Sequence, residues 1–342
     1  MAAPRTARHL SSRILRPAPM TALPRALAAL VCLAAAAAPL SAQADRDAGR
    51  SLERVLARQF QRQLDSVVAA GPGMVGVAVE DLSTGEVFAV NDSLRFPQAS
   101  AIKVAVLLEL MRQADVGTVA LAERVDVRAA QQVGGTGVLR MFADGASALS
   151  LHDLAVLMVV LSDNTATNLL VERVGMASVN RTLDSLGLSE VRLRRLMIRP
   201  SESARGNENV ASPRAAARLM ARVGRCELPM SRRACDQMRR ILELPKGGTV
   251  ADALPAGVPA AWKPGTLEGV STAWALVRLR GHPFAVAAMV TFGDGRADDV
   301  VRALVRLSYA HFARLAAATP YGVRVPDAVL PPADSLGVRR PR

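Results

Sequence analysis

A serine and a lysine one helical turn apart are the first chemical signal in this sequence. Ser100 follows Pro97 at the start of an expected helix, and Lys103 lies three residues on, on the same helix face. A serine hydroxyl is a poor nucleophile without a base, and a desolvated lysine amine can take its proton. The helix start also offers backbone N–H groups to a developing oxyanion. Alone, the pair equally fits an N-cap serine near a lysine.

Lysine is informative because the chain uses it so rarely. Among 43 basic residues only three are lysines, Lys103, Lys246 and Lys263. Where only positive charge is needed the chain uses arginine, so a lysine indicates an amine that must lose its proton or a compact cation.

A second short motif, Ser-Asp-Asn, follows an expected apolar helix over 151–161. Ser162 can relay a proton, Asp163 can fix the surrounding loop through backbone hydrogen bonds, and Asn164 can bind a substrate amide. By itself the motif is also an ordinary turn or cap.

The third motif lies on an expected strand near the end of the chain. Lys263 supplies a fixed cation, Pro264 follows it, and Gly265 and Thr266 complete the segment. Glycine in a strand permits close backbone approach to a ligand.

The pattern of elements predicts the fold that must bring these motifs together. A helix over 45–69 precedes a hairpin with strands at 74–80 and 86–90, and strands return at 260–262, 270–280 and 283–292 before a terminal helix. Residues 97–244 are mostly helical. We therefore predict an α+β sandwich: an antiparallel sheet built from both chain ends, flanked by helices, with an inserted helical subdomain and the site in the cleft between them.

In this order and at these intervals, the three motifs resemble the signature of the class A β-lactamases and the wider penicillin-recognising serine enzymes: S-x-x-K, S-D-N and K-T-G. The resemblance covers about residues 45–318 and includes the segment Gly135–Leu139 before the second motif. It implies a β-lactamase/transpeptidase-like fold and acyl transfer to a β-lactam or a D-Ala-D-Ala-like peptide.

The resemblance assigns a role to each motif residue. Ser100 attacks the carbonyl with Lys103 taking part in its activation, and Ser162 helps to protonate the leaving nitrogen. Lys263 holds the substrate carboxylate and Asn164 contacts the acyl amide. The oxyanion hole is formed by the backbone N–H groups of Ser100 and Thr266, next to Gly265.

Two departures from the family pattern bear on the activity. Pro264 stands where the family has a threonine or serine, so the third motif lacks a hydroxyl and an N–H donor at this position. Either Thr266 supplies the missing hydroxyl, or the substrate carboxylate is bound weakly. Class A enzymes release the acyl group with water activated by a loop glutamate, but Arg199 stands about where that acid is sought. Glu202 is the remaining candidate, while Glu208 is expected to pair with Arg194 or Arg195.

The first 44 residues have the pattern of a secretory signal. Five arginines precede the apolar run Ala26–Leu40, and Ala42-Gln43-Ala44 provides a small-residue cleavage site. The run is too short and alanine-rich for a good membrane span, although an uncleaved anchor is the alternative. We therefore predict a secreted or periplasmic protein with no stable membrane span after cleavage. A start at Met20 would give a more ordinary signal.

Removal of the signal lowers the formal net charge from +13 to +8. Aromatic residues make up only 3% of the chain and the arginines are scattered, so no platform for nucleic acid is expected. Cys226 and Cys235 remain, and an even pair in an exported protein favours a disulfide. No metal-ligand spacing is present, so no metal or other cofactor is expected, and the protein is expected to be a monomer.

We therefore predict three segments: a signal at 1–44, a catalytic domain at 45–319 and a disordered basic tail at 320–342. The predicted function is β-lactam hydrolysis through an acyl-enzyme. The alternatives are a penicillin-binding or D,D-peptidase-like enzyme and a non-enzymatic envelope protein that retains the fold. Histidine catalysis is disfavoured, because no G-x-S-x-G serine accompanies His152, His282 or His311.

Overall fold

The computed structural model describes residues 51–326 and 329. The predicted signal at 1–44 and most of the predicted tail lie outside these residues. Within the predicted tail, the chain turns back after residue 320, so that Ala318 and Arg324 form an antiparallel bridge. No helix in the described part of the chain combines the length and apolar character needed to cross a membrane.

The main sheet has five antiparallel strands in the order β2-β1-β9-β8-β7. Its strands are β1 (Met74–Asp81), β2 (Val87–Val90), β7 (Ala260–Leu267), β8 (Val270–Val277) and β9 (Phe284–Thr291). The N-terminal hairpin joins the C-terminal strands through β1 and β9, where Val79 pairs with Val286. The predicted sheet from both chain ends is confirmed.

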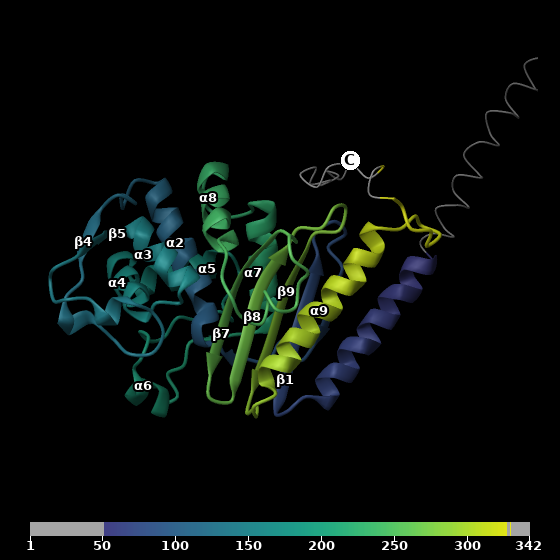
Figure 1. Cartoon of the computed structure of the whole chain (residues 1–342), viewed down its shortest axis with the longest axis horizontal. Helices are drawn as coiled ribbons and strands as arrows, with labels where there is room; N and C mark the ends of the chain where they lie inside the picture. The colour runs from purple at the N-terminus through teal and green to yellow at the C-terminus, as the bar shows by residue number, and fades with distance from the viewer. Residues whose placement is uncertain (1–50, 327–328, 330–342) are drawn as a thin grey trace, which may run out of the picture. The chain divides into compact units, whose positions relative to one another are not determined.

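The two faces of the sheet bury different side chains, as the two-residue period of a strand requires. On one face, Val77 and Val79 of β1 pack with Phe60 from the helix over residues 51–70 and with Phe312 from α9 (Ala297–Ala316). Figure 1 shows these two helices side by side over the sheet. On the other face, Ala78 packs with the helices of the insert.

The insert between β2 and β7 is mainly helical, as predicted. It begins with the 3-10 turn η1 (Ala99–Ile102), which leads into α2 (Lys103–Asp115). Its other helices are α3 (Leu151–Val160), α4 (Asn164–Val174), α5 (Met176–Ser185), α6 (Pro200–Ala204), α7 (Pro213–Arg225) and α8 (Arg232–Glu243). Short 3-10 turns also lie at η2 (Ala129–Gln131) and η3 (Leu139–Met141).

Two small sheets inside the insert were not predicted. β3 (Phe96–Pro97) pairs with β6 (Val210–Ala211), and β4 (Arg124–Asp126) pairs with β5 (Ala148–Ser150). Each strand has only two or three residues, too few to show a two-residue hydrophobic period. The first pair lies next to the site, because β3 leads directly into η1.

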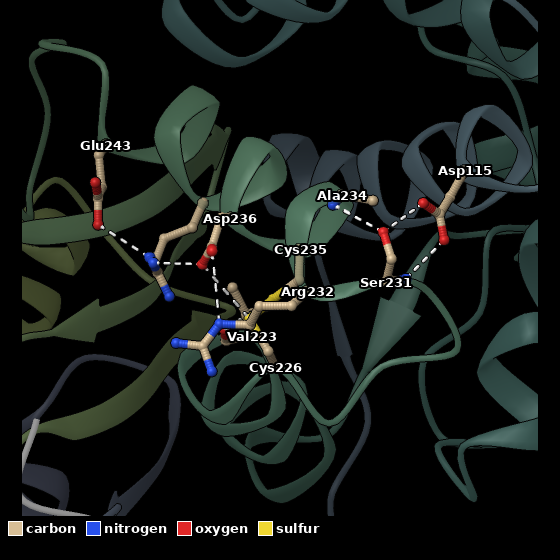
Figure 2. The surroundings of a disulfide bond; sticks show 10 residues. Asp115, Val223, Cys226, Ser231, Arg232, Ala234, Cys235, Asp236 and Glu243 are labelled. Atoms are coloured by element: carbon tan, nitrogen blue, oxygen red, sulfur yellow. Dashed lines mark hydrogen bonds and ion pairs between the residues drawn. A yellow bond between two sulfur atoms is a disulfide. The ribbon is translucent and has the colours of Figure 1, made fainter.

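A disulfide closes the turn between α7 and α8, confirming the predicted pairing of Cys226 with Cys235. Cys226 follows α7 as its C-cap, in a left-handed conformation with φ of 53°, and Cys235 lies within α8. Ser231 is the N-cap of α8, and its N–H donates to the Asp115 carboxylate at the end of α2 at 2.6 Å. Figure 2 shows these groups together, so the cross-linked turn is also tied to the helix that follows Ser100.

Candidate active site

The three motifs meet in one cleft of about 540 Å³. The 3-10 turn η1 brings Ser100, the turn between α3 and α4 brings Ser162 and Asn164, and the edge strand β7 brings Lys263. Gly265 and Thr266 also line the cleft, whereas Lys103 is fully buried at the start of α2. The fold thus gathers residues that are far apart in the chain, as the motifs predicted.

Lys103 is held by three acceptors. Its Nζ donates to the Ser162 carbonyl at 2.7 Å, to Ser162 Oγ at 3.1 Å and to Asn164 Oδ1 at 3.0 Å. Burial lowers the pKa of Lys103 well below its ordinary value, and the positive charge of Lys263 lowers the pKa further. A lysine amine with a lowered pKa can act as a base.

The Ser162 hydroxyl lies between two lysine amines. Lys263 Nζ donates to it at 3.0 Å, and Lys103 Nζ donates to it at 3.1 Å. Burial lowers the pKa of Lys263 to about 7, with a smaller contribution from the charge of Lys246. Ser162 itself has a left-handed φ of 53°, a strained conformation that tertiary contacts must maintain. The arrangement is suited to passing a proton through the hydroxyl.

Asp163 fixes the loop that covers this side of the cleft, as predicted. Its Oδ2 accepts from the N–H groups of Val138 at 2.7 Å and Leu139 at 2.9 Å, while Oδ1 caps α4 by accepting from Ala166 at 2.9 Å. Gly137 has a φ of 111°, and a Cβ there would lie 2.3 Å from the Asp163 carboxylate. Only glycine fits this approach.

Both the oxygen and the nitrogen of the Asn164 carboxamide form hydrogen bonds within the protein. Oδ1 accepts from Lys103, and Nδ2 donates to the Gly134 carbonyl at 3.1 Å. Asn164 also lines the cleft, where its predicted contact with a substrate amide stays a prediction.

Gly265 lets β7 pack directly against the backbone that carries Ser100. A Cβ at Gly265 would lie 2.6 Å from the Gln98 carbonyl oxygen and 2.7 Å from the amide nitrogens of Ser100 and Ala101. From the sequence, Gly265 was expected to let a ligand approach the backbone closely. In the structure, Gly265 instead lets β7 approach the backbone of Ser100 and Ala101. It places the Ser100 N–H beside the strand that carries Thr266.

Gln98 stabilises the turn that carries Ser100, but it was not identified from the sequence. Its side chain is fully buried: Nε2 donates to the Phe96 carbonyl at 2.8 Å, and Oε1 accepts from Trp274 Nε1 at 2.8 Å. Its carbonyl accepts from Thr272 Oγ1 at 3.1 Å. The one signal in the sequence was the position of this glutamine, two residues before Ser100. That signal was not enough, because its hydrogen-bond partner Trp274 lies far along the chain.

The structure does not bring Glu202 to the cleft. Its carboxylate accepts from Arg205 Nη1 and Asn207 Nδ2, both at 2.7 Å, and Glu202 is not among the residues that line the cavity. The hydrogen bond from Asn207 is the main cause that lowers its pKa. The expectation for Glu208 is confirmed, because it pairs with Arg195 at 2.7 Å.

Met197 occupies the inner side of this loop instead. Its N–H donates to Asn168 Oδ1 at 2.7 Å, and its carbonyl accepts from Asn168 Nδ2 at 3.2 Å. Met197 is buried yet lines the cleft, as does the exposed Arg199. Within the described residues, Asp298 is the one carboxylate lining the cavity, and its Oδ1 accepts from Ser271 Oγ.

The three histidines in the described part of the chain lie outside the cavity lining. His152 and His282 lie near Asp153 and Asp81, at 3.5 and 3.7 Å. His311 stacks on Phe60 with ring centroids 4.3 Å apart. Across residues 51–326, no group of three or more His, Cys, Asp or Glu side chains is arranged to hold a metal ion.

Comparison with known proteins agrees with this geometry. The model of the beta-lactamase enzyme family matches residues 59–312, so the chain belongs to that family. Beta-lactamase of Streptomyces fradiae is 29% identical over 80% of this chain and 89% of its own length. Beta-lactamase PSE-4 of Pseudomonas aeruginosa is 28% identical over 41% of this chain and 48% of its own, so the chain spans about half of that relative.

Solved structures share the fold. A mutant of PBP-A, determined as an acyl-enzyme complex with penicillin-G, has a TM-score of 0.68 and 28% identity, and covers 75% of this chain and 97% of its own. The beta-lactamase of Sphaerobacter thermophilus has a TM-score of 0.67 and 29% identity, over 73% and 97% of the two chains. The α+β architecture predicted from the order of helices and strands is that of class A beta-lactamases.

Proposed function

We propose that this chain is a serine hydrolase that is acylated on Ser100 by β-lactams and by peptides ending in D-Ala-D-Ala. The observation that carries the proposal is the Ser162 hydroxyl, held between the amines of Lys103 at 3.1 Å and Lys263 at 3.0 Å beside the Ser100 cleft. A protein that only binds a ligand needs no such pair of buried lysines around one hydroxyl.

In the proposed reaction, Lys103 is neutral and therefore keeps at most two of its three donated hydrogen bonds. Its free lone pair takes the proton from Ser100 Oγ while Oγ bonds to the scissile carbonyl carbon. The backbone N–H groups of Ser100 and Thr266 stabilise the negative charge on the carbonyl oxygen. The C–N bond then breaks, and a proton passes from Lys103 through Ser162 Oγ to the leaving nitrogen. Ser100 is left as an ester, and Lys103 is neutral again.

Release of the acyl group requires an activated water. A loop glutamate would have to activate water, but Glu202 is bonded to Arg205 and Asn207 away from the cavity lining, and Met197 lies on the inner face of the loop. We therefore favour a long-lived acyl-enzyme, as in a penicillin-binding or D,D-peptidase-like enzyme. Rapid β-lactam hydrolysis, the activity named for the relatives, is the second candidate.

Intact-mass measurements over time with benzylpenicillin test both candidates. We expect an adduct of one intact penicillin that persists, and none in the Ser100→Ala variant. A transient adduct with accumulating hydrolysed drug would select the β-lactamase candidate. No adduct in the wild type would reject the proposal and favour the non-enzymatic envelope protein.

We propose a secreted or periplasmic location. The predicted signal supports it, and so does the Cys226–Cys235 disulfide, because such bonds persist mainly in oxidising compartments. Fractionation of cells expressing the full chain, with a cytoplasmic marker, tests it; retention of the unprocessed chain in the cytoplasm would contradict it.

A further inference from the structure

The outer face of the helix over residues 51–70 carries a row of basic side chains. Arg54, Arg58 and Arg62 follow one another at four-residue steps, and all three are exposed. Residues four apart are neighbours on a helix surface, where like charges repel one another. Among residues 51–326, the guanidinium groups of Arg58 and Arg62 have no ion-pair or hydrogen-bond partner. The row is therefore a concentration of positive charge that the neighbouring side chains do not neutralise.

The two acids of the same helix interact with other groups. Asp65 Oδ1 accepts from Gln61 Nε2 at 3.0 Å. Glu53 lies near a second acid: burial raises the pKa of Glu86, and the negative charges of Asp81 and Glu53 raise it further. Within the described part of the chain, neither Asp65 nor Glu53 forms an ion pair with an arginine of the row. The basic row is thus left for a partner from outside the chain.

Two large apolar side chains are exposed near the start of this helix. Leu52 is 45% exposed and Val55 is 48% exposed. Val55 lies three residues after Leu52 and three before Arg58, so helical spacing places them along one side of the helix. The side that packs against the sheet is a different one, which carries Phe60. Basic residues next to exposed apolar residues are typical of a helix that lies at a membrane surface.

The neighbouring helix α9 adds a fourth arginine to this surface. Arg314 is exposed, and with Gln59 and Gln63 it lines a cavity of about 120 Å³ between the two helices, which lie side by side (Figure 1). The term terminal-helix face is used below for Leu52, Arg54, Val55, Arg58, Arg62 and Arg314. None of these residues lines the cleft around Ser100. A partner bound to this face is therefore separate from a substrate bound in the cleft.

We propose that the terminal-helix face binds a phospholipid bilayer that carries anionic headgroups. The arginines lie against the headgroups, and Leu52 and Val55 enter the interface between headgroups and acyl chains. A soluble polyanion would neutralise the arginines but leave the two apolar side chains in water, so a bilayer is the better match. Export of the chain, as proposed above, would bring it to such a surface. The inference does not depend on acylation of Ser100.

Sedimentation of the purified protein with lipid vesicles tests the proposal. One set of vesicles is phosphatidylcholine, and the other holds phosphatidylcholine and phosphatidylglycerol in equal parts. We expect binding to the anionic vesicles, weakened by added salt, and little binding to the neutral ones. Arg58→Gln/Arg62→Gln should weaken binding to the anionic vesicles about 25-fold, which is about fivefold for each arginine. Leu52→Gln/Val55→Gln should weaken it about tenfold.

The matched control is Arg218→Gln/Arg222→Gln on α7. These arginines are also four residues apart and have no ion-pair partner among the described residues, but α7 packs on the opposite face of the sheet. This variant should change vesicle binding less than about twofold. Circular dichroism and thermal unfolding establish that each variant is folded.

Three results would overturn the proposal. An equal loss in the two double-arginine variants would mean that net charge alone drives the binding. Unchanged binding of Leu52→Gln/Val55→Gln would favour a soluble polyanion as the partner of the arginines. No binding of the wild type to the anionic vesicles at low salt would exclude the bilayer directly.

Discussion

Replacing Gly265 by alanine should disable the nucleophile without removing any chemical group. The new Cβ would lie 2.7 Å from the Ser100 and Ala101 amide nitrogens, whereas ordinary contacts begin near 3.4 Å. The tightest contact would be with the Gln98 carbonyl oxygen at 2.6 Å, so either β7 or the backbone leading into η1 must retreat by about 0.8 Å. Since misplacement of a catalytic group by about 1 Å can lower a rate about 100-fold, we expect acylation by benzylpenicillin to fall about 10- to 100-fold.

Stopped-flow mixing with quench and intact-mass detection measures this rate. The matched control is Gly295→Ala, because a Cβ at Gly295 meets nothing within 4 Å, and its acylation rate should stay within about twofold of wild type. Thermal unfolding of both variants corrects each rate for the folded fraction. If folded Gly265→Ala were acylated at the wild-type rate, the contact between β7 and η1 would not be what positions Ser100.

Four further substitutions test other parts of the site and fold. Lys103→Arg should be nearly inactive in acylation assays, because arginine cannot act as the base; wild-type rates would exclude that role. Met197→Glu should shorten the lifetime of the penicillin adduct by placing a carboxylate in the cleft, whereas Glu202→Gln should leave it unchanged; the opposite result would restore Glu202 as the candidate that activates water. Burial lowers the pKa of His311 from 6.5 to about 4. The free energy of unfolding should therefore fall by about 3 kcal/mol as the pH falls from 6.5 to about 4, because the unfolded chain binds the proton more readily. Denaturant unfolding at several pH values measures this, and the loss should be smaller in His311→Phe; an equal loss in both proteins would show that His311 is not its source.

The residues to which chemical roles are proposed were the most predictable part of the site. Ser100, Lys103, Ser162 and Lys263 lie in short motifs whose order in the chain is itself a signal, and the structure places all of them around or beneath one cleft. The strands and the disulfide were predictable for a related reason. Their signals are local: alternating hydrophobic residues, turn residues and an even pair of cysteines.

The residues that position this machinery were less predictable. Gln98 bonds to Trp274, far along the chain, and Asn168 holds both backbone groups of Met197. Such contacts leave no period or spacing in the sequence, because each partner alone is an ordinary polar residue. Glu202 was chosen only as an acid in the expected loop, and nothing in the sequence indicated that its neighbours Arg205 and Asn207 bind its carboxylate in the structure.

The pairing of β1 with β9 has a consequence for the order in which the protein can fold. Val79 and Val286 are adjacent in the sheet but are separated by more than half of the chain. Contacts of such high sequence separation form slowly, because a long loop must close before they contribute stability. The helices of the insert are local and can form early, but Lys263 reaches Ser162 only after β7 joins β8 and β9. A chain truncated before β7 would therefore carry Ser100 and Lys103 but lack the strand that completes the cleft, so the cleft is completed late, when most of the molecule has folded.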